Sequence, residues 1–119
     1  NDETKWMWEA AHGAEDRFLD LLGRVDWRGS PAVAEPLQLA SKELLLLQAS
    51  DWQFVIKTRG AVDYGYRRFC DHLARFDRAC TITDARSRGD ADDELTTAEL
   101  HDIRLHDPCF EDLRLEWWT

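Results

Sequence analysis

The sequence lacks most of the features that mark small secreted or membrane proteins. Only three cysteines occur in 119 residues, and Cys70, Cys80 and Cys109 have no paired spacing, so no disulfide framework is predicted. This cysteine usage and the absence of a signal peptide favour a reducing, cytoplasmic setting. No run of about 18 apolar residues is present, so we expect no segment that crosses a membrane.

Positive charge is also scarce. The chain has 15 Lys and Arg against 24 Asp and Glu, which gives a net charge of −9. This excess of acid argues against a nucleic acid or an anionic membrane surface as partner, because both repel a negatively charged protein. It leaves a neutral ligand such as a sugar open.

The common catalytic and nucleotide-binding motifs are missing. The chain has no GxSxG, no Walker-type phosphate loop and no GxGxxG. Cys70 lies near His72 and Cys109 lies near His106, but neither pair has the CxxC or HxxxH spacing of a zinc site. We therefore expect no catalytic set, metal or cofactor in this chain.

A strong helical pattern is present. Apolar residues recur in steps of three and four, which predicts long helices over residues 2–25, 37–56 and 61–80. The second of these is apolar nearly all round, which is typical of a central helix that is buried on every side. In the third, Cys80 follows the inner seam, so it is predicted to be a small core residue and not a reactive thiol.

The remaining segments are shorter. Pro36 suits the first turn of the second helix, and residues 81–94 are expected to form a polar, acidic loop. Thr96 and Glu99 have the spacing of a capping box, which predicts a short helix that ends at Asp107–Pro108. The tail that follows is so apolar that we expect it to be docked.

The fold class is therefore all-α: a helical bundle of three long helices plus one or two short ones. Residues 1–119 are predicted to form a single domain, since this length suffices for one hydrophobic core. The chain begins at Asn1 without a methionine, so we expect it to be a piece of a longer protein.

Six tryptophans are an unusual number for this length. One interpretation is that they fill the core or a domain interface. The other is that some form a stacking platform for a sugar, because an aromatic ring offers a large flat apolar face.

The stretch LLLLQASDWQF, residues 44–54, carries the main candidate site. Asp51 continues the buried stripe of the second helix, so its carboxylate must be paired, neutralised or placed at a wet cleft. Gln48 and Trp52 share the same arc. Three interpretations stay open: Ser50 or Asp51 caps a new helical segment at a kink, the polar cluster opens toward a ligand cleft or another domain, or Asp51 forms a buried salt bridge with Arg67 or Arg68.

Several motifs resemble the C-terminal region of glycoside hydrolase family 57 branching enzymes. KELLLLQASDWQF is the most specific of them. NDETKWMW, YGYRRFCDHLARF and HDPCFEDL resemble further family motifs in the same order, so the resemblance covers nearly the whole chain. Trp52 follows Asp51 directly with no histidine nearby, which favours the branching-enzyme subgroup, whereas the tail RLEWWT departs from the pattern.

The resemblance implies a catalytic barrel upstream in the same polypeptide, which holds both catalytic carboxylates. Retaining glycosidases need two such groups roughly 5 Å apart, and no residue of this chain matches those motifs. It also implies that Gln48, Ser50, Asp51 and Trp52 lie where the helical domain meets the barrel, near the cleft for α-glucan. Trp6 and Trp8 are further candidates for the wall of that cleft.

The resulting hypothesis is a non-catalytic C-terminal helical domain of an α-1,4-glucan branching enzyme of glycogen and α-glucan metabolism. It would pack on the barrel and shape the glucan cleft, and the isolated chain would be inactive. The alternative is a stand-alone acidic helical module that binds another protein.

Overall fold

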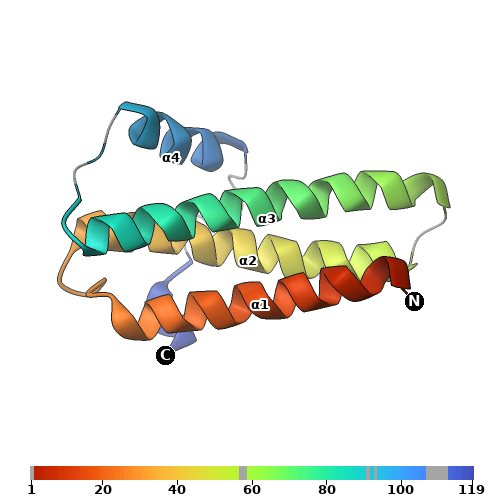
Figure 1. Cartoon of the computed structure of the whole chain (residues 1–119), viewed down its shortest axis with the longest axis horizontal. Helices are drawn as coiled ribbons and strands as arrows, with labels where there is room; N and C mark the ends of the chain where they lie inside the picture. The colour runs from red at the N-terminus through yellow and green to blue at the C-terminus, as the bar shows by residue number, and fades with distance from the viewer. Residues whose placement is uncertain (1, 57–58, 91, 93, 107–112) are drawn as a thin grey trace.

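The chain forms an all-α bundle, as predicted (Figure 1). The computed structural model describes residues 2–56, 59–90, 92, 94–106 and 113–119, and the side chains of 5–49, 67–90, 92, 95–106 and 113–119. Its elements are α1 (Asp2–Arg24), α2 (Pro31–Ile56), α3 (Arg59–Ser87), α4 (Glu94–His106) and the short 3-10 helix η1 (Leu115–Trp118). No helix in these ranges is long and apolar enough to cross a membrane.

The three long helices lie side by side along the 45 Å axis of the molecule, and α4 covers α3 on the side away from α1 (Figure 1). Among the described elements, α2 contacts each of the other four. The prediction of a central helix in this segment is therefore confirmed.

The core follows the predicted stripes. The predicted stripe of α2 is completely buried at Leu37, Ala40, Leu44 and Leu47. The seams of α1 and α3 close on them with their largest apolar residues, Met7, Phe18, Phe69 and Phe76. Cys80 is completely buried in the same cluster, which confirms its predicted role as a core residue.

The start of α2 differs from the prediction. The helix begins at Pro31, so Pro36 lies inside it and not in its first turn. The carbonyl of Ser30 accepts hydrogen bonds from the backbone N–H groups of Val33 and Ala34. These bonds close a first turn that begins at Pro31, five residues before Pro36. Pro31 suits the first helical position because its missing N–H would have no partner there.

An arginine of α3 compensates for the internal proline. Pro36 has no N–H to donate to the carbonyl of Ala32, four residues earlier. Arg86 donates from Nη1 to that carbonyl at 2.8 Å, and it also pairs with Asp92 and, at 3.5 Å, with Glu35. One guanidinium thus replaces the missing helical hydrogen bond and connects α2 to α3 and to the chain that follows α3.

Helix α3 extends seven residues beyond its predicted end, so the predicted loop begins as helix. Ile82 and Thr83 are buried and continue the inner seam past Cys80. The helix ends at Ser87, and the chain then turns at Gly89, whose φ of 80° is the left-handed conformation that glycine adopts most easily. The N–H of Gly89 bonds to the Arg86 carbonyl and that of Asp90 to the Ala85 carbonyl, which is a Schellman motif.

The predicted capping box of α4 is wrong. The helix begins at Glu94, so Thr96 is already helical, and Glu99 pairs with Arg78 of α3. The carboxylate of Glu99 therefore binds the neighbouring helix. Asp107 and Pro108, predicted to end this helix, lie outside the described residues.

The C-terminal segment is docked, as predicted. Leu113 and Leu115 are buried, and Gln38 of α2 donates to the carbonyl of Leu113 at 2.5 Å. The ring of Trp118 packs against Phe18 of α1 with centroids 4.8 Å apart. Residues 113–119 therefore complete the core between α1 and α2.

The role of Arg86 is testable by a double-mutant cycle with Pro36. Arg86→Met removes the donor to the Ala32 carbonyl, and we expect it to lower the free energy of unfolding by about 1 kcal/mol. In the Pro36→Ala background the restored N–H takes over that carbonyl, so Arg86→Met costs less. Urea unfolding of the parent, the two single variants and the double variant measures the coupling between the two positions. If the losses in unfolding free energy were strictly additive, Arg86 would not be the donor that replaces the missing N–H of Pro36.

Candidate functional site

The candidate residues gather at one end of the bundle. The first turns of α1, with Trp6 and Trp8, and the last turns of α2, with Gln48 to Trp52, lie at the same end in Figure 1. Gln48 is half-buried. The side chains of Ser50, Asp51 and Trp52 lie outside the described residues, so their orientation toward a cleft stays a prediction.

One of the three interpretations of Asp51 is wrong. Helix α2 continues without a break from Pro31 to Ile56. An N-cap residue has a non-helical backbone at the start of a helix, and neither Ser50 nor Asp51 has one. The cleft and the salt bridge with Arg67 or Arg68 therefore remain as hypotheses for Asp51.

The two N-terminal tryptophans face different surroundings. Trp6 packs edge-on against Phe69 of α3, with ring centroids 5.6 Å apart and 37% of its surface exposed. Trp8 lies against His12 of its own helix at 5.1 Å and is 52% exposed. Two residues of an α-helix correspond to a rotation of about 200°, so Trp6 and Trp8 leave α1 on nearly opposite faces. The two rings therefore do not form one continuous platform.

A buried polar pair links α2 and α3 below this end of the bundle. Glu43 Oε1 and His72 Nδ1 are 2.9 Å apart, and the two side chains are 0% and 2% exposed. His72 therefore contacts a buried acid and packs within the bundle. Glu43 was not singled out, although the expected burial of α2 on all sides implied that this carboxylate needed a partner inside.

Arg68 extends the pair to the surface. Its Nη2 lies 3.5 Å from His72 Nε2, and arginine can only donate. In the neutral imidazole, Nε2 therefore accepts and Nδ1 carries the hydrogen that faces Glu43. The chain of contacts runs from a buried carboxylate to an exposed guanidinium, and it joins the KELLLLQ segment to the YGYRRFCDH segment.

The remaining polar chemistry of the described residues is modest. Cys70 and Cys80 are free, and burial raises the pKa of the Cys80 thiol to about 12. Within the described ranges no three His, Cys, Asp or Glu side chains gather in a group that could hold a metal ion. Cys109 lies outside these ranges.

The architecture defines a class before any relative is considered: an acidic helical bundle with the polar pair of Glu43 and His72 buried between two of its long helices. Residues 10–118 match the family model described as 1,4-alpha-glucan branching enzyme, C-terminal. The chain therefore belongs to this family of C-terminal domains.

A curated relative supports the same assignment. A 1,4-alpha-glucan branching enzyme of Thermococcus kodakarensis is 42% identical over 78 residues, which cover 66% of this chain. The same match covers 11% of the relative, so the chain corresponds to a small part of that protein. No solved structure matches the chain.

Removal of one member of the buried pair should destabilise the fold strongly, whereas replacement of both members by apolar residues should destabilise it little. His72→Leu leaves Glu43 buried without this partner, and we expect a loss of about 3–5 kcal/mol in the free energy of unfolding. Replacing both residues by leucine should recover most of that loss. The exposed pair of His106 and Asp102, 3.1 Å apart, is the matched control, since His106→Leu should cost less than about 1 kcal/mol. A double variant as unstable as His72→Leu in urea unfolding would contradict this account.

The raised pKa of the Cys80 thiol predicts that the fold loses stability at alkaline pH. Its pKa is about 12 in the folded chain, against a usual value of 9.0. Above about pH 9 the unfolded chain loses this proton while the folded chain keeps it. The free energy of unfolding should therefore fall with pH, by up to about 1.4 kcal/mol per unit, until about pH 12.

Cys80→Ala is the variant that checks this slope. Below pH 9 the variant should be less stable than the parent by a constant amount, because the thiol is protonated in both states. Above pH 9 the two stability curves should converge. Parallel curves through pH 11 would show that Cys80 does not contribute the slope.

Proposed function

We propose that this chain is the non-catalytic C-terminal helical domain of a glycoside hydrolase family 57 branching enzyme. In this proposal it packs on the catalytic barrel of the same polypeptide and shapes the cleft that binds α-glucan. The observation that carries the proposal is the family match over residues 10–118. The full enzyme would act as a transferase in the cytoplasm, in the synthesis of glycogen or a related α-glucan.

The end of the bundle with Trp6, Trp8 and Gln48 is the proposed contact with barrel and glucan. Trp8 is 52% exposed and Trp6 is 37% exposed. Large aromatic surfaces of this kind are enriched where proteins meet a partner. Because Trp6 leans toward α3 and Trp8 does not, we assign Trp6 to the packing of the domain on the barrel and Trp8 to the wall of the cleft.

The exposed Arg68 strengthens this assignment. Its guanidinium contacts His72, which Glu43 holds from inside the bundle. An arginine that is held in place loses less side-chain freedom when it binds a partner. A barrel carboxylate or a glucan hydroxyl is the kind of group that this donor would meet.

Exclusion of water is the mechanism that such a domain supplies. A branching enzyme must hold a glycosyl-enzyme intermediate until a 6-hydroxyl attacks it, and water competes with that hydroxyl. A helical wall that covers the cleft lowers the access of water, so transfer is favoured over hydrolysis. The alternative of a stand-alone acidic interaction module rests on the short length of 119 residues and the net charge of −9.

The site proposal is tested in the enzyme encoded by the complete reading frame. Asp51→Asn and Trp52→Ala should each lower branching of amylose by about tenfold to hundredfold, because small displacements of a cleft wall misalign the acceptor. The released reducing ends should rise relative to new branches. An assay of reducing ends before debranching measures hydrolysis, and the further reducing ends that debranching releases count the new branches.

Asp90→Asn is the matched control for the aspartate change. Asp90 is exposed and its contact with Arg88 is long, at 3.4 Å. Asp92 is unsuitable, since it pairs with the largely buried Arg86. Equal effects at Asp51 and Asp90 would overturn the role of Asp51, and a reading frame without a barrel upstream of Asn1 would overturn the proposed function itself.

A further inference from the structure

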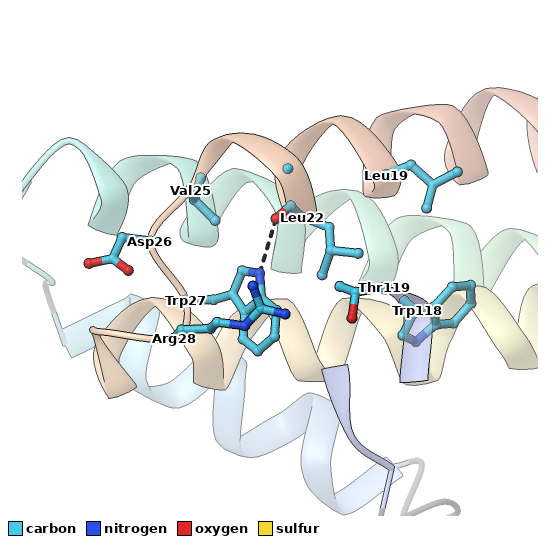
Figure 2. Close-up of a pocket in the computed structure, with 9 residues that line it drawn as sticks. Leu19, Leu22, Val25, Asp26, Trp27, Arg28, Trp118 and Thr119 are labelled. Atoms are coloured by element: carbon cyan, nitrogen blue, oxygen red, sulfur yellow. Dashed lines mark hydrogen bonds between the residues drawn. The ribbon is translucent and has the colours of Figure 1, made fainter. Parts of the chain in front are cut away.

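A cavity lies at the opposite end of the bundle from the candidate cleft. Its volume is about 460 Å³, within the range of roughly 300–1,000 Å³ that is typical of small-molecule sites. Figure 2 shows Leu19 and Leu22 of α1 along one edge, Trp27 and Arg28 of the α1–α2 connection at one side, and Trp118 and Thr119 at the other.

The aromatic parts of this cavity are held rigidly. The indole N–H of Trp27 donates to the carbonyl of Leu22 at 3.0 Å, and the ring is buried (Figure 2). The guanidinium of Arg28 lies 4.5 Å from the centre of that ring. Trp118 is fixed from behind by Phe18. A ligand would therefore meet the fixed ring of Trp118 and the guanidinium that covers Trp27, and it would spend little free energy on arranging them.

A second recess adjoins the cavity. This recess, of about 280 Å³, shares Trp27 and Arg28 with the first and is lined further by Ala34, Gln38 and residues 113–116. We call the two recesses together the groove; their walls extend from α1 across the connection to the C-terminal segment. Such a shape suits a chain-like ligand better than a compact one.

Charge selects the class of ligand. The groove is bordered by two acidic and two basic side chains, Asp26, Glu116, Arg28 and Arg114. These charges balance, although the whole chain carries −9. A balanced lining favours neither a cation nor an anion, while exposed carboxylates and guanidinium groups offer acceptors and donors to hydroxyl groups.

We propose that this groove, defined by Leu19, Trp27, Arg28 and Trp118, binds a neutral α-glucan chain as a second glucan contact away from the catalytic cleft. Flat apolar faces and many hydroxyl groups are what such a lining recognises. The identity of the sugar rests on the proposed function. Leu19 and Trp8 are about 17 Å apart along α1 at 1.5 Å per residue, so a polymer bound here would be tethered at a distance from the cleft and presented to it at a raised effective concentration.

The six indole N–H signals of the 119-residue chain report which end binds sugar. In a titration with maltoheptaose we expect the signals of Trp27 and Trp118 to shift and to saturate together. Trp118→Leu should weaken the affinity by about tenfold, which is the scale of one lost aromatic contact. Arg28→Ala, which leaves the packed rings in place, should weaken it by at least about threefold.

Trp117→Ala is the matched control. Trp117 is 68% exposed and lines neither part of the groove, so this variant should bind as the parent does. Thermal unfolding of each variant separates loss of binding from loss of fold.

Three outcomes would overturn the groove. Shifts confined to Trp6, Trp8 and Trp52 would place the sugar at the other end, which fits the proposed function without a second contact. The absence of any shift up to the solubility of the sugar would exclude the groove and leave the proposed function to the assay of the complete enzyme. Self-association of the sugar-free chain that Leu19→Asp abolishes would make the groove a protein interface.

Discussion

The enclosure of α2 is the constraint on which the rest of the structure depends. A helix in contact with every other described element has little access to water, so its polar groups need partners from those elements. Glu43 finds His72 on α3, the Ala32 carbonyl finds Arg86 on α3, and Gln38 binds the carbonyl of Leu113 in the C-terminal segment. Two of these contacts join α2 to α3 and the third joins α2 to the C-terminal segment, so together they align the apolar seams of these three parts of the chain.

The fold was largely predictable because its signal is periodic. Stripes of three- and four-residue steps gave the three long helices and the buried position of Cys80. The errors fell at the ends of helices, where a single tertiary contact outweighs local preference. Arg86 makes Pro36 tolerable inside α2, and Glu99 pairs with Arg78 and not with the start of its own helix. No local pattern in the sequence encodes either contact.

The candidate site was predictable only in part. The resemblance located Gln48 to Trp52 and the two N-terminal tryptophans, and the fold brings these segments to one end of the bundle. The different surroundings of Trp6 and Trp8 follow from packing on α3, which residue spacing alone did not reveal. Glu43 was missed because it lies among leucines, where a charged residue gives no periodic signal, and the groove was missed because it combines segments nearly 90 residues apart.

The docking of residues 113–119 has a consequence for how the chain is made. Phe18 is translated a hundred residues before Trp118, whose ring packs against it in the folded chain. Until Trp118 has left the ribosome, α1, α2 and α3 can pair with one another, but the side of Phe18 that Trp118 covers remains open to other apolar surfaces. An apolar part of α1 is therefore exposed during synthesis until residues 113–119 dock on it.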